Sequence, residues 1–212
     1  MFDYSLAHWL TFFTAAFLLN LSPGPDMAFI LGQTARDGAR SGFAAMFGIW
    51  SGAFLHVLFA AIGLSAIVAT SAAAFAVVKW VGAGYLVWLG IQAWRTDGTE
   101  GEPKARNANA SRLAIFRQGI LVAALNPKVA IFFLAFLPQF VVEGAGPTSM
   151  QLFLHGALII VVAATIEPPL VIVGGKLSNL LKGSPRVGQL MERALGSLFI
   201  ALGIRLALSG RN

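Results

Sequence analysis

The stretch NLSPGPDM, residues 20–27, lies inside a long apolar segment near the beginning of the chain. Pro23 and Pro25 lack a backbone N–H and clash with the preceding turn, so a regular helix cannot continue undisturbed through them. Gly24 between them frees the backbone, and Ser22 suits the N-cap of a helix that restarts. We therefore predict two half-helices, the second of which begins near Pro23 inside the apolar segment.

The composition indicates an integral membrane protein. Of the 212 residues, 57% are hydrophobic and 11% are charged, whereas an ordinary soluble domain is about 25% charged. A soluble fold of this length has too high a surface-to-volume ratio to bury so much apolar surface. The basic residues are scattered between apolar segments, which is typical of topology-setting charges rather than of a nucleic-acid surface. The absence of cysteine excludes disulfides and thiol chemistry.

Six apolar segments are long enough to cross a bilayer core, which requires about 20 residues per helix. The first has neither a basic leader nor a cleavage site, so we expect it to remain as a span. Residues 96–111 (TDGTEGEPKARNANAS) are typical of an aqueous loop. The six predicted spans are residues 6–35, 43–69, 72–94, 115–142, 150–175 and 189–208.

The distribution of Lys and Arg predicts the orientation in the membrane. The first link contains Arg36 and Arg40, and the third and fifth links are also basic. The second link contains Lys79 alone, and the fourth, EGAGPTS at 143–149, contains no basic residue. Because Lys and Arg are enriched in cytoplasmic links, we expect the odd-numbered links in the cytoplasm and both termini on the periplasmic or extracellular side.

The six spans divide into two groups of three, and an odd number per group places the second group in the inverted orientation. Spans one and four are both long, and each contains a helix breaker with polar neighbours, NLSPGPD at 20–26 and LNPK at 125–128. Proline-interrupted segments at matching places in two halves point to a transporter site. We therefore predict an all-α integral membrane protein with six transmembrane helices in a three-plus-three inverted repeat, helices one and four being broken.

The predicted domain organisation is a single membrane transport domain over residues 1–212. Its first repeat covers about residues 1–95 and its second about residues 112–212, with the loop 96–111 between them.

The first break supplies groups that complement a zwitterion. The first turn of the second half-helix carries unpaired N–H groups and a partial positive charge, which can hold a carboxylate. Asp26 lies in the same turn and can face an ammonium group. The alternative is that Pro-Gly-Pro only kinks span one and that Asp26 merely caps the half-helix.

The second break lies at Asn126 and Pro127, where the asparagine side chain can satisfy the interrupted backbone. Lys128 follows about ten residues into span four, which is roughly 15 Å along a helix. Two interpretations of Lys128 stay open at this point: it pairs with Asp26 across the two halves, or its long stem extends to an interface.

Glu167 lies in span five and is followed by Pro168 and Pro169, which we expect to disturb the helix. A carboxyl group in a membrane can carry a proton, because burial disfavours its charged form. The alternative is a residue near a helix end that reaches water.

His56 follows Gly48 and Gly52 at four-residue spacing in span two. Glycines at this spacing allow another helix to approach closely, and His56 then either forms a hydrogen bond to that helix or relays protons. Tyr85 in span three lies in GAGYLVWLG and either packs between helices or lines a substrate pocket.

The sequence contains no signature of an enzyme. It has no HExxH, no phosphate-binding glycine loop and no nucleophile elbow. Its three histidines, at 8, 56 and 155, lie in separate spans without the spacing of metal ligands. We therefore expect no enzymatic activity, no cofactor and no metal.

The order of motifs along nearly the whole chain closely resembles the LysE/RhtB family of amino-acid exporters. The motifs are NLSPGPDMAFIL (20–31), ARDGARSGFAAMFGIWSGAFLH (35–56), GAGYLVWLGIQAWR (82–95), RQGILVAALNPKVAIFFLAFLPQFV (117–141) and GSLFIALGIRLAL (196–208).

The resemblance implies six spans, an inverted repeat, and amino-acid export from a bacterial cytoplasm across the inner membrane, coupled to the proton-motive force. Glu167 with its double proline departs from the family, which often carries a different acidic position in span five. Relatives export basic amino acids, threonine, homoserine, leucine or cysteine derivatives, so the substrate stays open. The residues that correspond to the family's two breaks are Pro23, Gly24, Pro25, Asp26, Asn126 and Pro127.

The leading hypothesis is a secondary transporter, an antiporter in which Asp26 binds the substrate ammonium group and Glu167 cycles protons. Export of a small cation or metal is less consistent with the few carboxylates and histidines in the spans. A membrane enzyme or structural membrane protein would need a catalytic set, or no central ionisable residues. The predicted partners are an amino acid, protons and the lipid bilayer, with no nucleic acid. Glycine-spaced faces on spans two, three and six pack either within the subunit or between subunits of a homo-oligomer, and this alternative stays open.

Overall fold

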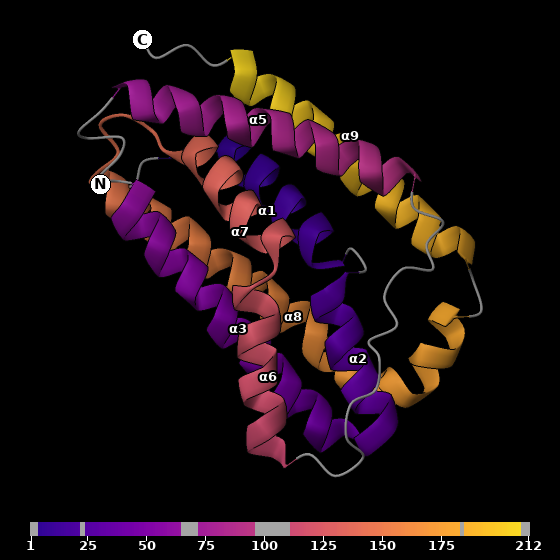
Figure 1. Cartoon of the computed structure of the whole chain (residues 1–212). Helices are drawn as coiled ribbons and strands as arrows, with labels where there is room; N and C mark the ends of the chain where they lie inside the picture. Colours follow the sequence, from indigo (N-terminus) through magenta and orange to yellow (C-terminus); the bar gives the residue numbers. More distant parts are fainter. Residues whose placement is uncertain (1–3, 22–23, 65–71, 96–110, 183–184, 209–212) are drawn as a thin grey trace.

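The computed structural model describes residues 4–21, 24–64, 72–95, 111–182 and 185–208 (Figure 1). Within these ranges the chain forms helices and no strand. Ser22, Pro23 and nearly all of the predicted loop 96–111 lie outside the described residues.

The first half of the chain contains α1 (Leu6–Leu21), α2 (Pro25–Asp37), α3 (Ala39–Phe59), the π-helical turn η1 (Ala60–Leu64) and α5 (Ala72–Arg95). The second half contains α6 (Arg112–Ala124), α7 (Pro127–Phe136), the 3-10 turn η2 (Leu137–Phe140), α8 (Thr148–Lys182) and α9 (Pro185–Leu208). The all-α class predicted from the sequence is therefore confirmed for the described part of the chain.

Two helical stretches are long and apolar enough to cross a membrane, Ala39–Leu64 and Thr148–Gly174. A third candidate is the pair formed by α6 and α7, whose axes meet at 56°. Helix α1 is apolar but has 16 residues, and the apolar part of α9, Phe199–Leu208, is also short. By length and composition, the described residues thus contain two or three candidate spans, and the six-span arrangement stays a prediction.

The helix boundaries differ from the predicted ones at three places. Only Gly38 separates α2 from α3. Its φ of 81° is a backbone conformation that residues other than glycine rarely adopt, and it allows the chain to change direction within one residue. Helix α9 begins at Pro185, since proline fits the first turn of a helix. Helix α8 continues through Pro168 and Pro169, so the two prolines do not end the helix. Membrane helices tolerate proline where neighbouring helices and local adjustments satisfy the freed carbonyl groups.

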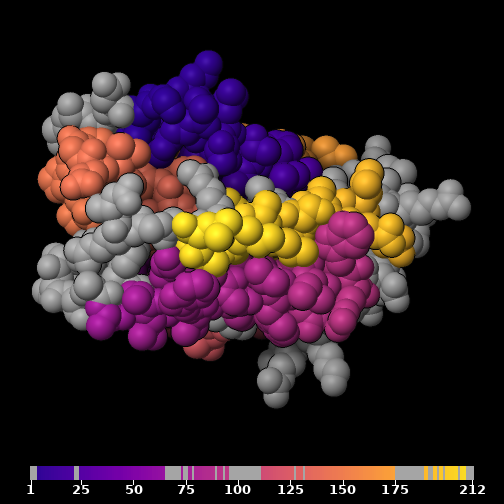
Figure 2. All heavy atoms as spheres, turned by 90° about the horizontal axis from the view of Figure 1, so that it is seen from above, coloured from indigo at the N-terminus to yellow at the C-terminus, as the bar shows by residue number. Residues whose placement is uncertain are grey.

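The helices pack mainly in pairs. Helices α5 and α9 lie side by side along one face of the molecule, as Figures 1 and 2 both show. Helix α3 packs along α6 and also contacts α2 and α8. Helix α7 lies between these groups and contacts both α5 and α3.

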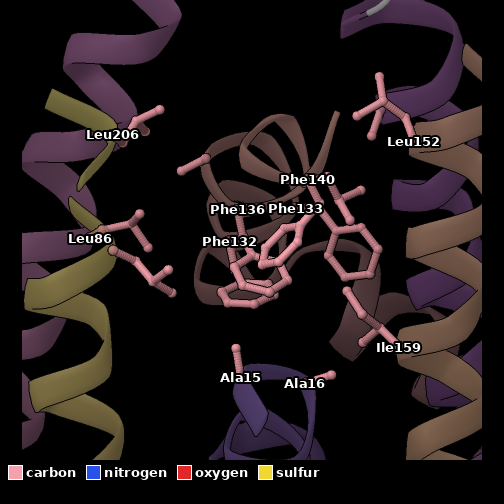
Figure 3. Close-up of a cluster of buried hydrophobic side chains, with 14 of the residues drawn as sticks. Ala15, Ala16, Leu86, Phe132, Phe133, Phe136, Phe140, Leu152, Ile159 and Leu206 are labelled. Carbon is pink, nitrogen blue, oxygen red and sulfur yellow. The ribbon is translucent and has the colours of Figure 1, made fainter. Parts of the chain in front are cut away.

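Helix α7 and η2 supply the centre of the larger hydrophobic cluster (Figure 3). Stacked and tilted rings run along this segment, and Phe132 lies 4.4 Å from Phe136 between ring centroids. Small residues of α1, Ala15 and Ala16, face the rings from another side. The rings of α7 and η2 are Phe132, Phe133, Phe136 and Phe140.

A second cluster joins α2, α3, α6 and α8 around Phe29, Met46, Ile115 and Val171. Burial of a large apolar side chain stabilises a fold by about 1.5–3 kcal/mol in water, but in a membrane the gain comes mainly from tight packing. The larger cluster therefore fixes α7 against α3 and α8, and the second cluster fixes α2 against the same two helices.

The glycines of α3 allow α6 to approach closely, as the sequence predicts. A Cβ atom added to Gly52 would lie 2.5 Å from the carbonyl oxygen of Ile120, and one added to Gly119 would lie 2.7 Å from that of Ala45. Side chains at these positions would separate the two helices.

We predict that Gly52→Ala lowers the melting temperature of the purified protein in detergent, because overpacking destabilises a close contact by about 1–3 kcal/mol. The matched control is Gly84→Ala in α5, where the added Cβ meets no atom within 4 Å. That control should leave the melting temperature unchanged or raise it, since alanine favours helix by about 1 kcal/mol over glycine. Equal behaviour of the two variants would contradict the packing account.

Candidate functional site

A cavity of about 80 Å³ lies between α1, α2, α3, α7 and α8, at the level of the two chain breaks. Its wall combines apolar side chains with a few polar and ionisable ones. Members of both hydrophobic clusters line it, Ile49 from one and Phe133 and Ile159 from the other. The polar and ionisable lining residues are Asn20, Asp26, Trp50, Asn126, Lys128 and Glu167.

Asp26 reaches the cavity from the first turn of α2. Gly24 precedes this helix in an extended conformation, and Pro25 occupies the first helical turn. The carboxylate Oδ1 of Asp26 accepts a hydrogen bond of 2.9 Å from the side-chain Nδ2 of Asn126. This bond joins residues 100 positions apart, and it brings the two sequence breaks together.

Asn126 is almost completely buried and serves both breaks at once. Its Oδ1 accepts a hydrogen bond of 3.0 Å from the backbone N–H of Lys128 and so caps α7. Its Nδ2 donates to Asp26. Because both ends of the amide are used, the side chain has a single orientation, and it fixes the position of the Asp26 carboxylate relative to α7.

Lys128 brings a basic group to the same cavity from the first turn of α7. Its Nζ lies 3.7 Å from the point that a Cβ on Gly24 would occupy, so the ammonium group lies beside the first break. Asp26 and Lys128 thus line one cavity from opposite breaks.

Glu167 lies on the α8 side of the cavity and is buried. Its Oε2 accepts a hydrogen bond of 2.7 Å from the indole Nε1 of Trp50 on α3. The cavity therefore contains two carboxyl groups, Asp26 and Glu167, each bonded to a side-chain N–H of another helix.

Sequence reasoning missed Trp50 and Asn20 as members of the site. Trp50 could have been found from its place inside a predicted span, where an indole N–H requires a partner. Asn20 donates to the carbonyl oxygens of Ala16 at 2.8 Å and Ile159 at 3.3 Å, and so ties α1 to α8 beside the cavity. The sequence signal for Asn20 was its position as a polar residue in an apolar segment, just before the proline break.

Two predicted site residues lie elsewhere in the structure. The Nε2 of His56 lies 3.1 Å from the carbonyl oxygen of Ala123 on α6, so the predicted hydrogen bond to a neighbouring helix is present. The ring of Tyr85 on α5 lies 5.3 Å from that of Trp88 and packs against the larger cluster. Neither is among the described residues that line the cavity.

The structure describes both breaks except for Ser22 and Pro23. Gly24, Pro25 and Asn126 border the cavity, and Pro127 opens α7. In the described part of the chain, no group of three or more His, Asp or Glu side chains could hold a metal ion.

These features define a class of protein: a helical membrane protein in which polar groups from several helices meet at one internal cavity. The family model described as LysE type translocator matches residues 17–210, and the chain belongs to this family. The resemblance noted in the sequence is thereby confirmed.

Several curated relatives match almost the whole chain. A homoserine/homoserine lactone efflux protein of Salmonella typhimurium is 32% identical over 199 residues, which cover 94% of this chain and 95% of the relative. An uncharacterized membrane protein of Vibrio cholerae is 31% identical over 202 residues, covering 94% and 96%. No solved structure matches the chain. Membrane location and a role in transport and efflux follow from the family and these relatives.

We predict that Asp26 and Asn126 are energetically coupled. In a double-mutant cycle with Asp26→Ala, Asn126→Ala and both changes together, thermal unfolding should show a coupling free energy of about 0.5–3 kcal/mol, as expected for residues in contact.

The matched control is a cycle of Asp26→Ala with Ser111→Ala. Ser111 caps α6 by accepting a hydrogen bond of 3.2 Å from the backbone N–H of Ala114, away from the cavity. That pair should be additive within about 0.5 kcal/mol. Additivity of Asp26 with Asn126 as well would contradict the contact.

Proposed function

We propose that the protein is a secondary transporter that exports amino acids or close derivatives from the bacterial cytoplasm, in exchange for protons. The observation that carries this proposal is the hydrogen bond between Asp26 and Asn126, which unites two chain breaks at one cavity. Interrupted helices that meet in this way form the binding sites of many transporters. The family and the efflux relatives support the same direction of transport.

The substrate that fits best is an amino acid with an uncharged side chain. In the proposed binding mode, the Asp26 carboxylate receives the ammonium group, while Lys128 and the first-turn N–H groups of α2 receive the carboxylate. The cavity is largely apolar beyond these groups, and it favours an uncharged side chain over a basic one. The efflux relative named for homoserine and its lactone makes homoserine the first substrate to test.

The proposed membrane arrangement has six spans in two inverted groups of three, with one transport domain over residues 1–212. Helices α1 and α2 form the first broken span, and α6 and α7 form the fourth; the 56° bend between α6 and α7 supports the second of these. The basic links indicate cytoplasmic ends at the junctions of α2 with α3 and of α8 with α9. Both termini then face the periplasm, and the membrane is the inner one.

Proton exchange is proposed to use the two carboxyl groups of the cavity. A buried carboxyl group binds a proton more readily than an exposed one, and protonation of Asp26 would weaken its hold on a substrate ammonium group. Glu167, held by Trp50 at 2.7 Å, lies within the same cavity and can exchange the proton. Because these steps transfer only protons between carboxyl groups and water, the proposal requires neither an enzymatic reaction nor a cofactor.

We predict that Asp26→Asn reduces homoserine export at least tenfold, because the variant loses the negative charge opposite the ammonium group; a loss of about 1.4 kcal/mol already corresponds to a factor of ten. Uptake into everted membrane vesicles measures the rate. The matched control is Asp37→Asn, which removes an exposed ion pair with Arg36 at 2.7 Å and should keep the wild-type rate. Unchanged export by Asp26→Asn would refute its proposed role.

We predict that Glu167→Gln separates transport from proton coupling. The variant should still exchange labelled for unlabelled homoserine across the membrane, but a pH gradient should no longer drive accumulation. Glu143→Gln, a change at an exposed position on the connection before α8, should leave both activities unchanged. Gradient-driven accumulation at the wild-type level in Glu167→Gln would contradict the assignment.

A further inference from the structure

A second polar site lies away from the cavity, where the beginning of α1 meets α8. The Nε2 atoms of His8 and His155 are 2.8 Å apart. Twelve residues, or about 18 Å of helix, separate His8 from Asn20 along α1, and the same interval separates His155 from Glu167 along α8. Both helices therefore run from this histidine pair to the central cavity, where Asn20 again bonds to α8.

The α8 side of this site is rigidly built. Gln151 is almost completely buried; its Oε1 accepts from the backbone N–H of Val142 at 2.9 Å, and its Nε2 donates to the carbonyl oxygens of Val142 and Gly146. From the α1 side, Tyr4 Oη donates to the same Oε1 at 3.0 Å. The contacts of Tyr4 with Gln151 and of His8 with His155 thus fasten the beginning of α1 to a fixed support.

The hydrogen-bond geometry limits how many protons the two histidines can hold in contact. The Nδ1 of His155 lies 2.8 Å from the carbonyl oxygen of Gln151 and must donate to it, because a carbonyl oxygen only accepts. In the neutral ring, the Nε2 of His155 therefore accepts from His8. One added proton keeps this bond, since a single hydrogen still lies between the two Nε2 atoms whichever ring carries the charge. A second proton places hydrogens on both Nε2 atoms, and the contact cannot persist.

The surrounding aromatic rings offset part of the cost of burying a positive charge on the histidine pair. Tyr4 stacks on His8 with centroids 4.4 Å apart, and Trp9 stacks on His155 at 5.5 Å. Phe140 stacks on His155 at 5.9 Å, and Phe12 meets it edge-on at 4.9 Å. Aromatic faces within about 6 Å attract a cation. The site thus accommodates one charge, whereas two charges 2.8 Å apart would repel each other strongly.

Among the residues that the structure describes, few ionisable groups lie around the histidine pair. Tyr4 faces it from the segment before α1, the contacting residues of η2 and α8 are Phe140 and Gln151, and Glu143 on the connection between η2 and α8 is exposed. Asp3 lies outside the described residues.

We propose that His8 and His155 form a proton-binding site distinct from the central cavity, which holds the beginnings of α1 and α8 together until both imidazoles are protonated. Histidine changes its charge between about pH 5 and 8, so the site responds to the acidity of the medium that it faces. With the topology proposed above, that medium is the periplasm, and opening of this end would admit protons to the cavity and release the exported substrate.

The test measures the separation of the two helices and does not require transport. The chain has no cysteine, so Leu6→Cys and Ser149→Cys, both at exposed positions, can carry spin labels in lipid nanodiscs. We expect pulsed electron paramagnetic resonance to show a longer label-to-label distance at about pH 5 than at about pH 8. A distance that is the same at both pH values would overturn the proposal.

Two histidine variants test whether His8 causes the pH-dependent change in the label-to-label distance. His8→Gln keeps an N–H donor near Nε2 but does not titrate, so the short distance should persist at both pH values. His56→Gln should retain the full pH response, because His56 bonds to α6 instead. An opening in His8→Gln equal to that of the doubly labelled parent would refute the assignment. If His8→Gln fails to fold, His155→Gln carries the same expectation, since its amide reaches the Nε2 position that faces His8 and does not titrate.

Discussion

The structure depends most on one side-chain hydrogen bond, from Asn126 Nδ2 to Asp26 Oδ1. An interrupted helix inside a membrane leaves backbone groups that water cannot satisfy, so each break requires a polar partner. Asn126 meets this requirement in α7 by capping the N–H of Lys128, and the remaining end of its amide binds the carboxylate of the other break. One side chain thereby caps α7 and holds the carboxylate of Asp26, and both residues line the cavity proposed as the substrate site.

Packing holds this contact in place. The phenylalanine rings of α7 and η2 anchor one break in the larger hydrophobic cluster, while Phe29 and Ile30 anchor α2 in the other. The glycines of α3 let α6 approach closely, so the helix before the second break is fixed as well. Rigid surroundings of this kind keep two carboxyl groups and an ammonium group in a small cavity at defined positions, which selective binding requires.

Much of this arrangement could be predicted from the sequence, for local reasons. Proline and glycine in apolar segments mark breaks whatever the tertiary structure is, and the four-residue spacing of Gly48 and Gly52 marks a close helix contact. Partners across helices could not be predicted in the same way. The bond of Trp50 to Glu167 joins residues 117 positions apart, and nothing in either local sequence identifies the other. The continuity of α8 through two prolines likewise depends on its neighbours rather than on its sequence.

The central claim is that the two breaks form one substrate site. Hydrogen–deuterium exchange read by mass spectrometry tests it most directly, with an amino acid selected because it raises the melting temperature in a screen of the twenty amino acids and homoserine. The account predicts that this ligand slows exchange in peptides covering residues 24–28 and 126–130 together, and that Asp26→Asn abolishes both effects. Slowed exchange at one break alone, or at neither, would contradict it.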